Sequence, residues 1–333
     1  MLSQGNCVGD IVYSVGEDVP NSLLWRDIPA GYDYDGCGWD ALSVMTVKDG
    51  RITLPSGISY KVLQLADHRL LTPKVVRKLK ELVESGAVVI GPKPLKSPSL
   101  QGYPACNEEV RKLADEVWGD CNGYDITQHS FGKGKVYWGK KLADVFSEMN
   151  LPPDFEFTSS IPDSKLNYIH RRTDDADIYF VSNQKEREEK VVCSFRIDNK
   201  EPELWYPDNG KMVRSIIYNR ENKRTLIPLN LDPAGSVFVV FRHTAAKDPA
   251  VSIYPEAAVS GNDKGNLELV ASKPGSYHLK RASGTVQNVN VAAVPETVTI
   301  SGTWNLEFPL LSKKIINTAF DGLVSWTENE DKE

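Results

Sequence analysis

The sequence predicts a three-layer α/β domain followed by antiparallel β-sandwich structure. Before residue 151, short apolar runs alternate with segments of helical periodicity, which is typical of a parallel sheet covered by helices. After Pro152 and Pro153 the helical period disappears, and short strand-like runs separated by turn residues follow one another. We therefore expect an α/β domain at 1–151, an antiparallel sandwich at 152–265 and a further β-rich segment at 266–333.

Strands of the α/β domain are expected at 10–14, 60–65, 87–91 and 134–139, with a hairpin at 46–60 that turns at Asp49-Gly50. Thr72 and Pro73 begin an amphipathic helix that Gly86 ends. Asn107 is expected to cap a second helix, and a third occupies 141–149 before the proline pair.

The expected sandwich strands lie at 166–172, 177–182, 190–197, 203–206, 214–219, 225–229 and 236–241. From residue 266 onward a weaker β-pattern continues, with 298–300 and 304–308 resembling the opening strands of a third unit. That unit ends in a polar stretch soon after it begins. We therefore expect the chain to be a piece of a longer protein.

Composition restricts the classes of partner. The net charge of −6 argues against nucleic acid, because phosphate binding needs clustered Lys and Arg. No apolar run approaches the length of a membrane helix, so no membrane partner is expected. Five cysteines without a CxxC pair and five histidines without ligand spacing indicate neither a metal site nor a disulfide framework.

Five stretches of the sequence stand out together: GYDYDGCGWDAL at 31–42, VKDGRITLPSGISYKVLQL at 47–65, GPKPLKSPSL at 91–100, YIHRRTDDADIYFVSN at 168–183 and PELWYPDNG at 202–210. In their order and spacing they resemble the C-terminal half of glycoside hydrolase family 106 α-L-rhamnosidases. SGTWNLEF at 301–308 and LVSWTENEDKE at 323–333 are similar to the start of the sugar-binding-type sandwich that follows in such enzymes.

The resemblance implies a substrate, a fold and a missing catalytic part. The substrate would be a rhamnose-containing plant polysaccharide, and the α/β domain would be an amidotransferase-like module. In the family, two glutamates of a barrel N-terminal to this region act as acid and base in an inverting hydrolysis, with calcium nearby. We therefore assign no catalytic residue and expect no cofactor here. The barrel would be the partner of this chain, and the intact enzyme would be periplasmic or secreted.

The segment 31–40 holds the candidate substrate-binding residues. Aromatic faces stack on sugar rings, and carboxylates accept hydroxyl hydrogen bonds or hold a hard cation. In the alternative, the segment is a structural turn whose aspartates bond their own backbone and whose last one caps a helix, and turn chemistry alone favours this. The candidates are Tyr32, Asp33, Tyr34, Asp35, Trp39 and Asp40.

Two other motifs leave alternatives open. Cys37 between two glycines could be an amidotransferase nucleophile, but no apolar strand precedes it and no histidine partner is apparent. His170-Arg171-Arg172 could clamp a sugar, although an interdomain ion pair is favoured. Three functions therefore compete: part of a glycosidase, a stand-alone carbohydrate-binding or structural accessory module, and a thiol-dependent hydrolase.

Overall fold

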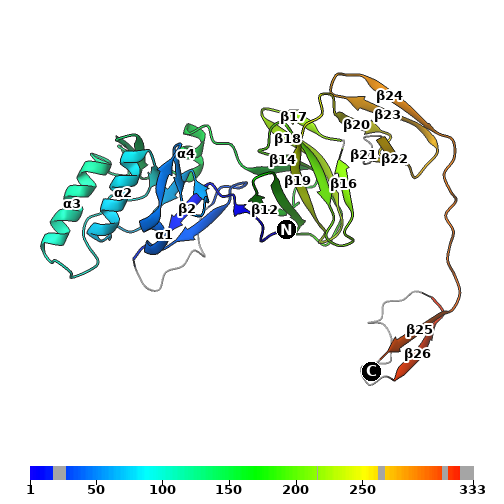
Figure 1. The fold of residues 1–333 in the computed structure, drawn as a ribbon, viewed down its shortest axis with the longest axis horizontal. Helices are drawn as coiled ribbons and strands as arrows, with labels where there is room; N and C mark the ends of the chain where they lie inside the picture. The colour runs from blue at the N-terminus through cyan, green and yellow to red at the C-terminus, as the bar shows by residue number, and fades with distance from the viewer. Residues whose placement is uncertain (18–27, 216, 262–266, 310–313, 323–333) are drawn as a thin grey trace. The chain divides into compact units, whose positions relative to one another are not determined.

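The computed structural model describes residues 1–17, 28–215, 217–261, 267–309 and 314–322. Contacts between residues divide the chain into two units, Met1–Val270 with Ser276–Val289, and Ala271–Gly275 with Asn290–Glu333. The predicted combination of an α/β sheet and antiparallel β-structure is confirmed (Figure 1). No described helix is long and apolar enough to cross a membrane.

A six-stranded sheet forms the centre of the α/β part. The strands pair in the order β3-β2-β7-β8-β10-β9, and all of these pairings are parallel except that of β9 with β10. The short apolar runs of the sequence become its central strands. The strands are β2 (Ile11–Ser14), β3 (Tyr34–Cys37), β7 (Val62–Gln64), β8 (Val88–Ile90), β9 (Gln128–Phe131) and β10 (Gly134–Tyr137).

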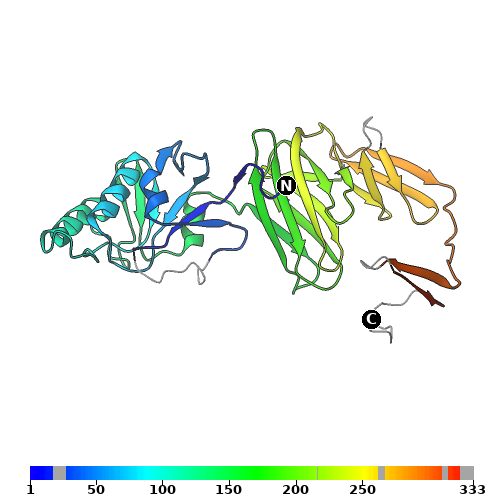
Figure 2. The ribbon, with the colours of Figure 1, turned by 60° about the horizontal axis from the view of Figure 1, so that its bottom comes forward.

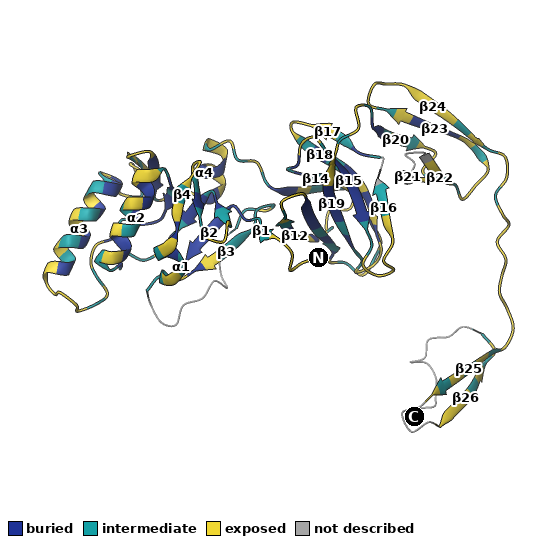
Figure 3. Ribbon diagram, viewed as in Figure 1, coloured by how far each residue is buried: buried dark blue, intermediate teal, exposed yellow. Residues whose placement is uncertain are grey.

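Helices cover both faces of this sheet, which gives the three layers. Side chains alternate along β2, so Val12 joins a core with helices α1 (Trp39–Val44), α2 (Pro73–Ser85) and α3 (Ala105–Trp118). Ile11 and Tyr13 point to the other face and pack with Val145 and Phe146 of α4 (Leu142–Glu148). The buried residues along the sheet are dark blue in Figure 3.

The helix boundaries confirm most of the predicted ends and correct one. Helix α2 begins after Thr72 and ends at Gly86, whose φ of 119° is left-handed. Helix α3 begins at Ala105, two positions before the cap predicted at Asn107, because the side chain of Asn107 instead accepts the amide of Ser97 at 2.9 Å.

The predicted hairpin forms a small separate sheet of β4 (Thr46–Lys48), β5 (Arg51–Thr53) and β6 (Ser59–Tyr60). Asp49 and Gly50 both have positive φ at its turn, as the Asp-Gly pair predicts.

Two antiparallel sheets follow, packed face to face as a sandwich (Figures 1 and 2). Tyr179 and Phe241 of the larger sheet meet Phe195 and Ile227 of the smaller one in a common core. The larger sheet has the order β1 (Asn6–Cys7), β12 (Leu166–Arg172), β13 (Asp177–Asn183), β19 (Ser236–Thr244), β15 (Lys200–Trp205), β16 (Met212–Ser215), β21 (Ala258–Gly261) and β22 (Leu267–Val270). The smaller sheet has the order β11 (Phe155–Ser159), β14 (Glu189–Phe195), β18 (Arg224–Leu231) and β17 (Asn219–Glu221).

The first strand of the chain belongs to the sandwich and not to the α/β sheet that follows it. Asn6 pairs with Arg172 and Cys7 with Arg171 in an antiparallel ladder, and the amide of Val8 continues it. Gly5 makes this approach possible, since a Cβ there would lie 2.1 Å from the carbonyl oxygen of Arg172. The local sequence pattern does not indicate this long-range pairing.

The remaining strands form two small sheets. One contains β20 (Ala250–Tyr254), β23 (Gly275–Arg281) and β24 (Val286–Val291), and the other contains β25 (Trp304–Pro309) and β26 (Ile315–Phe320). The strand predicted at 304–308 is therefore present, whereas 298–300 is not a strand. The stretch 323–333 lies outside the described residues. The domain boundaries at 151 and 265 stay predictions.

Candidate functional site

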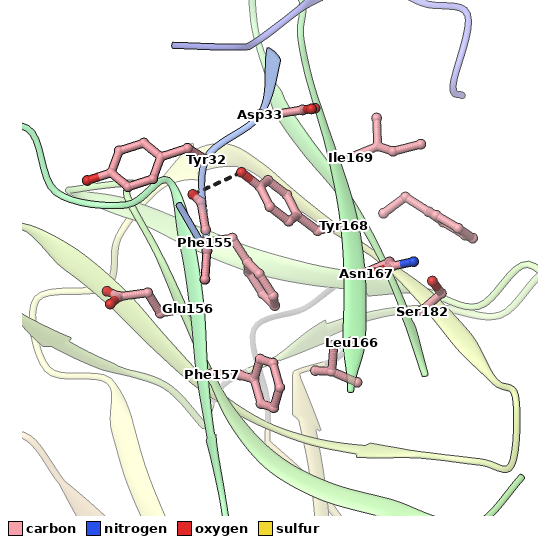
Figure 4. A pocket seen from close by; sticks show the side chains of 13 residues that line it. Tyr32, Asp33, Phe155, Glu156, Phe157, Leu166, Asn167, Tyr168, Ile169 and Ser182 are labelled. Atoms are coloured by element: carbon pink, nitrogen blue, oxygen red, sulfur yellow. Dashed lines mark hydrogen bonds between the residues drawn. The ribbon is translucent and has the colours of Figure 1, made fainter. Parts of the chain in front are cut away.

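A cleft of about 760 Å³ lies where the segment 30–33 meets strands β11 and β12 of the sandwich (Figure 4). These two strands belong to different sheets, so the cleft opens along the side of the sandwich. It is lined by Ala30, Gly31, Tyr32, Asp33, Phe155, Glu156, Phe157, Leu166, Asn167, Tyr168, Ile169, Phe180 and Ser182.

Gly31 fixes the segment 30–33 against the sandwich. Its carbonyl oxygen accepts the amide of Asp154 at 2.8 Å, the amide of Phe155 at 3.2 Å and the hydroxyl of Tyr168 at 3.0 Å. Gly31 has a φ of 82°, and a Cβ there would lie 2.3 Å from the oxygen of Phe155. Only glycine combines that backbone conformation with so close an approach.

Tyr32 and Asp33 are the two sequence-predicted residues that line the cleft. The hydroxyl of Tyr32 donates to the carbonyl of Leu151 at 2.6 Å, and its ring lies 4.5 Å from that of Phe146. Burial raises the pKa of Tyr32 to about 12. Asp33 accepts the amide of Tyr34 at 2.8 Å, and burial raises its pKa despite this bond. Both side chains are therefore held in place.

The opposite wall of the cleft combines aromatic and polar side chains that the sequence reasoning missed. Phe157 and Tyr168 supply rings, while Asn167 and Ser182 supply an amide and a hydroxyl. Glu156 is about half-exposed, and its carboxylate lies 3.3 Å from Arg224 Nη2. The sequence marked Asn167, Tyr168 and Ser182 only as strand positions and predicted no strand at 155–159, and no local signal places these residues together.

The other predicted residues do not line this cleft. The ring of Tyr34 meets that of Tyr13 edge-on at 5.6 Å, and Asp35 accepts the hydroxyl of Tyr60 at 2.8 Å. Trp39 and Asp40 begin α1, beyond the carboxyl end of β3, whereas Tyr32 and Asp33 precede its amino end. Lys74 Nζ lies 4.6 Å from the centre of the Trp39 ring, and Asp40 is exposed in the first turn behind the cap residue Gly38.

A buried charged cluster lies within the sandwich. His170 Nδ1 is 2.9 Å from Asp154 Oδ2, its Nε2 is 3.1 Å from Asp177 Oδ1, and its ring stacks on Tyr179 at 3.9 Å. Both ring nitrogens donate only in the imidazolium form. Burial alone would lower the pKa of His170, but the bonds to the two carboxylates outweigh it and raise the pKa. The cluster is therefore charged and fully paired.

Among the described residues, Arg196 makes an ion pair that joins the α/β part to the sandwich. Its Nη2 donates to Asp10 Oδ2 at 2.8 Å and lies 3.3 Å from Asp154 Oδ1. Asp10 precedes β2 and is buried, and burial raises its pKa against the opposing charge of Arg196. The sequence predicted an interdomain ion pair for 170–172. The structure gives that ion pair to Arg196, which shares the partner Asp154 with His170.

The side chains of 170–172 brace the first strand and the hairpin of the sandwich. Arg171 donates to the carbonyls of Gln4 and Gly5, and Arg172 pairs with Asp177 at 2.6 Å. Among the described residues, the hydrogen bonds and ion pair of Arg171 and Arg172 therefore go to protein groups at one edge of the sheet, which supports a structural role.

Cys37 lacks the surroundings of a nucleophile. It ends β3 with 4% of its surface exposed, and burial raises the pKa of its thiol to about 12. Within the described ranges, its sulfur makes no hydrogen bond to a histidine or any other group. The same part of the chain contains no group of three or more His, Cys, Asp or Glu side chains suited to a metal ion.

A parallel α/β sheet followed by an antiparallel sandwich also occurs in a solved glycoside hydrolase. The rhamnosidase from Novosphingobium sp. PP1Y matches with a TM-score of 0.66 and 29% identity, over 81% of this chain and 27% of that one. The family described as alpha-L-rhamnosidase, glycoside hydrolase family 106, matches residues 1–220. The chain belongs to this family.

A curated relative supports the same class. A provisionally named beta-glucuronidase of Formosa agariphila is 36% identical over 282 residues, which cover 83% of this chain and 23% of the relative. The chain thus spans about a quarter of the length of both proteins.

Proposed function

We propose that this chain is the accessory part of a glycoside hydrolase that cleaves α-L-rhamnosidic bonds in rhamnose-containing plant polysaccharide. The family match over residues 1–220 carries this proposal. The acid and base would lie on a barrel elsewhere in a longer polypeptide, together with any calcium. This chain covers only about a quarter of the length of its relatives, which supports a separate location for the catalytic residues.

The chemistry of the cleft supports binding in preference to hydrolysis. An inverting glycosidase needs one carboxylic acid that protonates the leaving oxygen and one carboxylate that activates water. Glu156 Oε2 lies 3.3 Å from Arg224 Nη2, and Asp33 accepts the amide of Tyr34. Each of these two carboxyl groups therefore already has a protein partner.

Tyr32 and Asp33 are proposed to contact the glycan, either when it is bound or as it enters the enzyme. With the rings and amide of the opposite wall they form the mixed polar and apolar lining that sugar sites use. Tyr34, Asp35, Trp39 and Asp40 would act on this site only through the fold. The alternative function is that of a non-catalytic carbohydrate-binding or structural module. A carbohydrate-binding module would use the same cleft.

Hydrolysis by the purified chain tests the proposal. We expect no release of aryl alcohol from an aryl α-L-rhamnoside above the buffer rate. The Asp33→Asn and Glu156→Gln variants should be indistinguishable from the wild type in this assay. Turnover by the wild type that Glu156→Gln abolishes would place the chemistry within these 333 residues and refute the division of labour. The gene sequence upstream of the Met1 codon should also encode an in-frame barrel.

A further inference from the structure

A second, smaller cleft of about 370 Å³ lies in the α/β part, away from the segment 30–33. Arg69 follows β7, Lys93 follows β8 and Trp138 follows β10, and these three strands are parallel neighbours. Their lining residues therefore gather at the carboxyl ends of the strands. Open parallel sheets characteristically bind ligands outside this edge.

The charge of this cleft is positive although the chain as a whole is acidic. Three basic residues line it, Arg69, Lys93 and Arg111, against the single carboxylate of Asp115. Lys93 Nζ is 2.7 Å from Asp115 Oδ1 and also donates to the carbonyl of Gly119, so these two charges offset each other. No carboxylate that lines the cleft therefore remains to offset the charges of Arg69 and Arg111.

Arg69 is held in one orientation. Its Nε donates to the carbonyl of Lys93 at 2.8 Å, and its Cζ lies 4.9 Å from the centre of the Trp138 ring. Gly123 packs against that ring so closely that a Cβ would lie 2.8 Å from it, which fixes the tryptophan. Within the described chain, the two terminal nitrogens of Arg69 have no hydrogen-bond partner. A planar guanidinium group with two unpaired terminal nitrogens can donate two parallel hydrogen bonds to a carboxylate.

Arg111 is the second guanidinium group in the lining of the cleft. It lies on α3, it is exposed, and it forms no ion pair among the described residues. Asp115, one turn further along α3, is already taken by Lys93. Apolar surface adjoins the two guanidinium groups, because Pro94, the half-exposed Leu95 and Trp138 line the same cleft.

We propose that this cleft binds the carboxylate of a uronic acid residue in an acidic glycan. The two guanidinium groups would hold the carboxylate, and the apolar wall would contact the C–H face of the sugar ring. The assignment to a sugar rests on the proposed function, whereas the assignment to a carboxylate rests on the two arginines.

Isothermal titration of the full chain with a matched pair of sugars tests this site. Methyl glucuronide and methyl glucoside differ only in the carboxylate, so we expect the glucuronide to bind and the glucoside not to. Binding should weaken as salt is raised. Arg111→Gln should reduce the affinity about tenfold or more, since one charge-assisted hydrogen-bond donor is lost. Lys112→Gln, the next residue on the same helix and outside the cleft, is the control and should leave affinity nearly unchanged.

Arg69→Gln removes the guanidinium group that Lys93 and Trp138 hold in place, and it should also weaken the binding of the glucuronide. The melting temperature of this variant controls for a loss of folding. Equal binding of the two sugars, or equal affinity of wild type and Arg111→Gln, would overturn the proposal. Inorganic phosphate that binds as tightly as the glucuronide would overturn the assignment to a sugar. Because this experiment involves no hydrolysis, its failure is separate from any failure of the rhamnosidase assignment.

Discussion

Replacement of His170 is expected to destabilise the sandwich strongly. The side chain is fully buried between Asp154 and Asp177, so its removal leaves two buried carboxylates short of a partner. Breaking a buried ion pair costs roughly 3–5 kcal/mol. Arg196 still reaches Asp154, and Lys200 still reaches Asp177, so the lower end of that range, about 3 kcal/mol, is expected for His170→Ala.

This loss corresponds to a fall in melting temperature of about 6–12 °C, at roughly 2–4 °C per kcal/mol for domains of this size. Thermal unfolding followed by circular dichroism measures it. His243→Ala is a matched control, because His243 Nε2 is also 3.0 Å from a carboxylate, that of Glu203, but its side chain is half-exposed. Such exposed pairs contribute about 0–1 kcal/mol. Equal losses in the two variants would refute the argument from burial.

The pH dependence gives a second readout of the same cluster. The pKa of His170 is raised, so its stabilisation is complete below its ordinary pKa of 6.5 and is lost as pH rises through the raised value. The pKa values of Asp154 and Asp177 are lowered, so their contribution is present above about 3.9 and is lost as pH falls through the lowered values. The stability difference between wild type and His170→Gln should therefore be largest near about pH 5–6 and shrink in alkaline solution. A difference that grows with pH would contradict the charged form.

The other predictions concern the segment 31–37. Cys37 should react with iodoacetamide at neutral pH only after unfolding, because burial raises its pKa to about 12; rapid labelling of the native protein, read by mass spectrometry, would revive the thiol hydrolase. Asp35→Ala should lower the melting temperature and leave the kinetics of the full-length enzyme intact, since the buried hydroxyl of Tyr60 loses its acceptor at a cost of about 1–3 kcal/mol. Weakened substrate use with an unchanged melting temperature would instead indicate direct contact with the sugar. Gly31→Ala should destabilise the chain by about 2 kcal/mol or more in denaturant unfolding, because its Cβ would meet the oxygen of Phe155; wild-type stability would contradict this.

Local sequence signals predicted the elements whose determinants are local. Helix α2 lies where Thr72, Pro73 and Gly86 place its ends, and the turn at Asp49-Gly50 forms as expected. Strand β9 was missed because Gln128–Phe131 is mostly polar and is ordered by pairing with β10. The start of α3 was misplaced because a side chain that can cap a helix was used to hold the preceding loop.

The candidate site was predictable on one side only. The composition of 31–40 drew attention to Tyr32 and Asp33, which do line the cleft. The opposite wall comes from β11, β12 and β13, and the alternation along β11 and β12 is that of any half-buried strand. Arg196 and Asp10, far apart in the sequence, form their pair only through the tertiary fold. No spacing rule reports a contact of that range.

The position of β1 has a practical consequence for dividing this protein. The chain starts in the larger sheet of the sandwich, leaves it to build the α/β part, and returns to it at β12. A fragment cut at residue 152 would therefore lose β1 and uncover the backbone of Arg171 and Arg172 along the edge of β12. Uncovered edges invite pairing with other chains, so such a fragment is expected to aggregate. A fusion that reattaches 1–9 through a short linker ahead of Asp154 should remain in solution, as the α/β part is inserted between two neighbouring strands of one sheet.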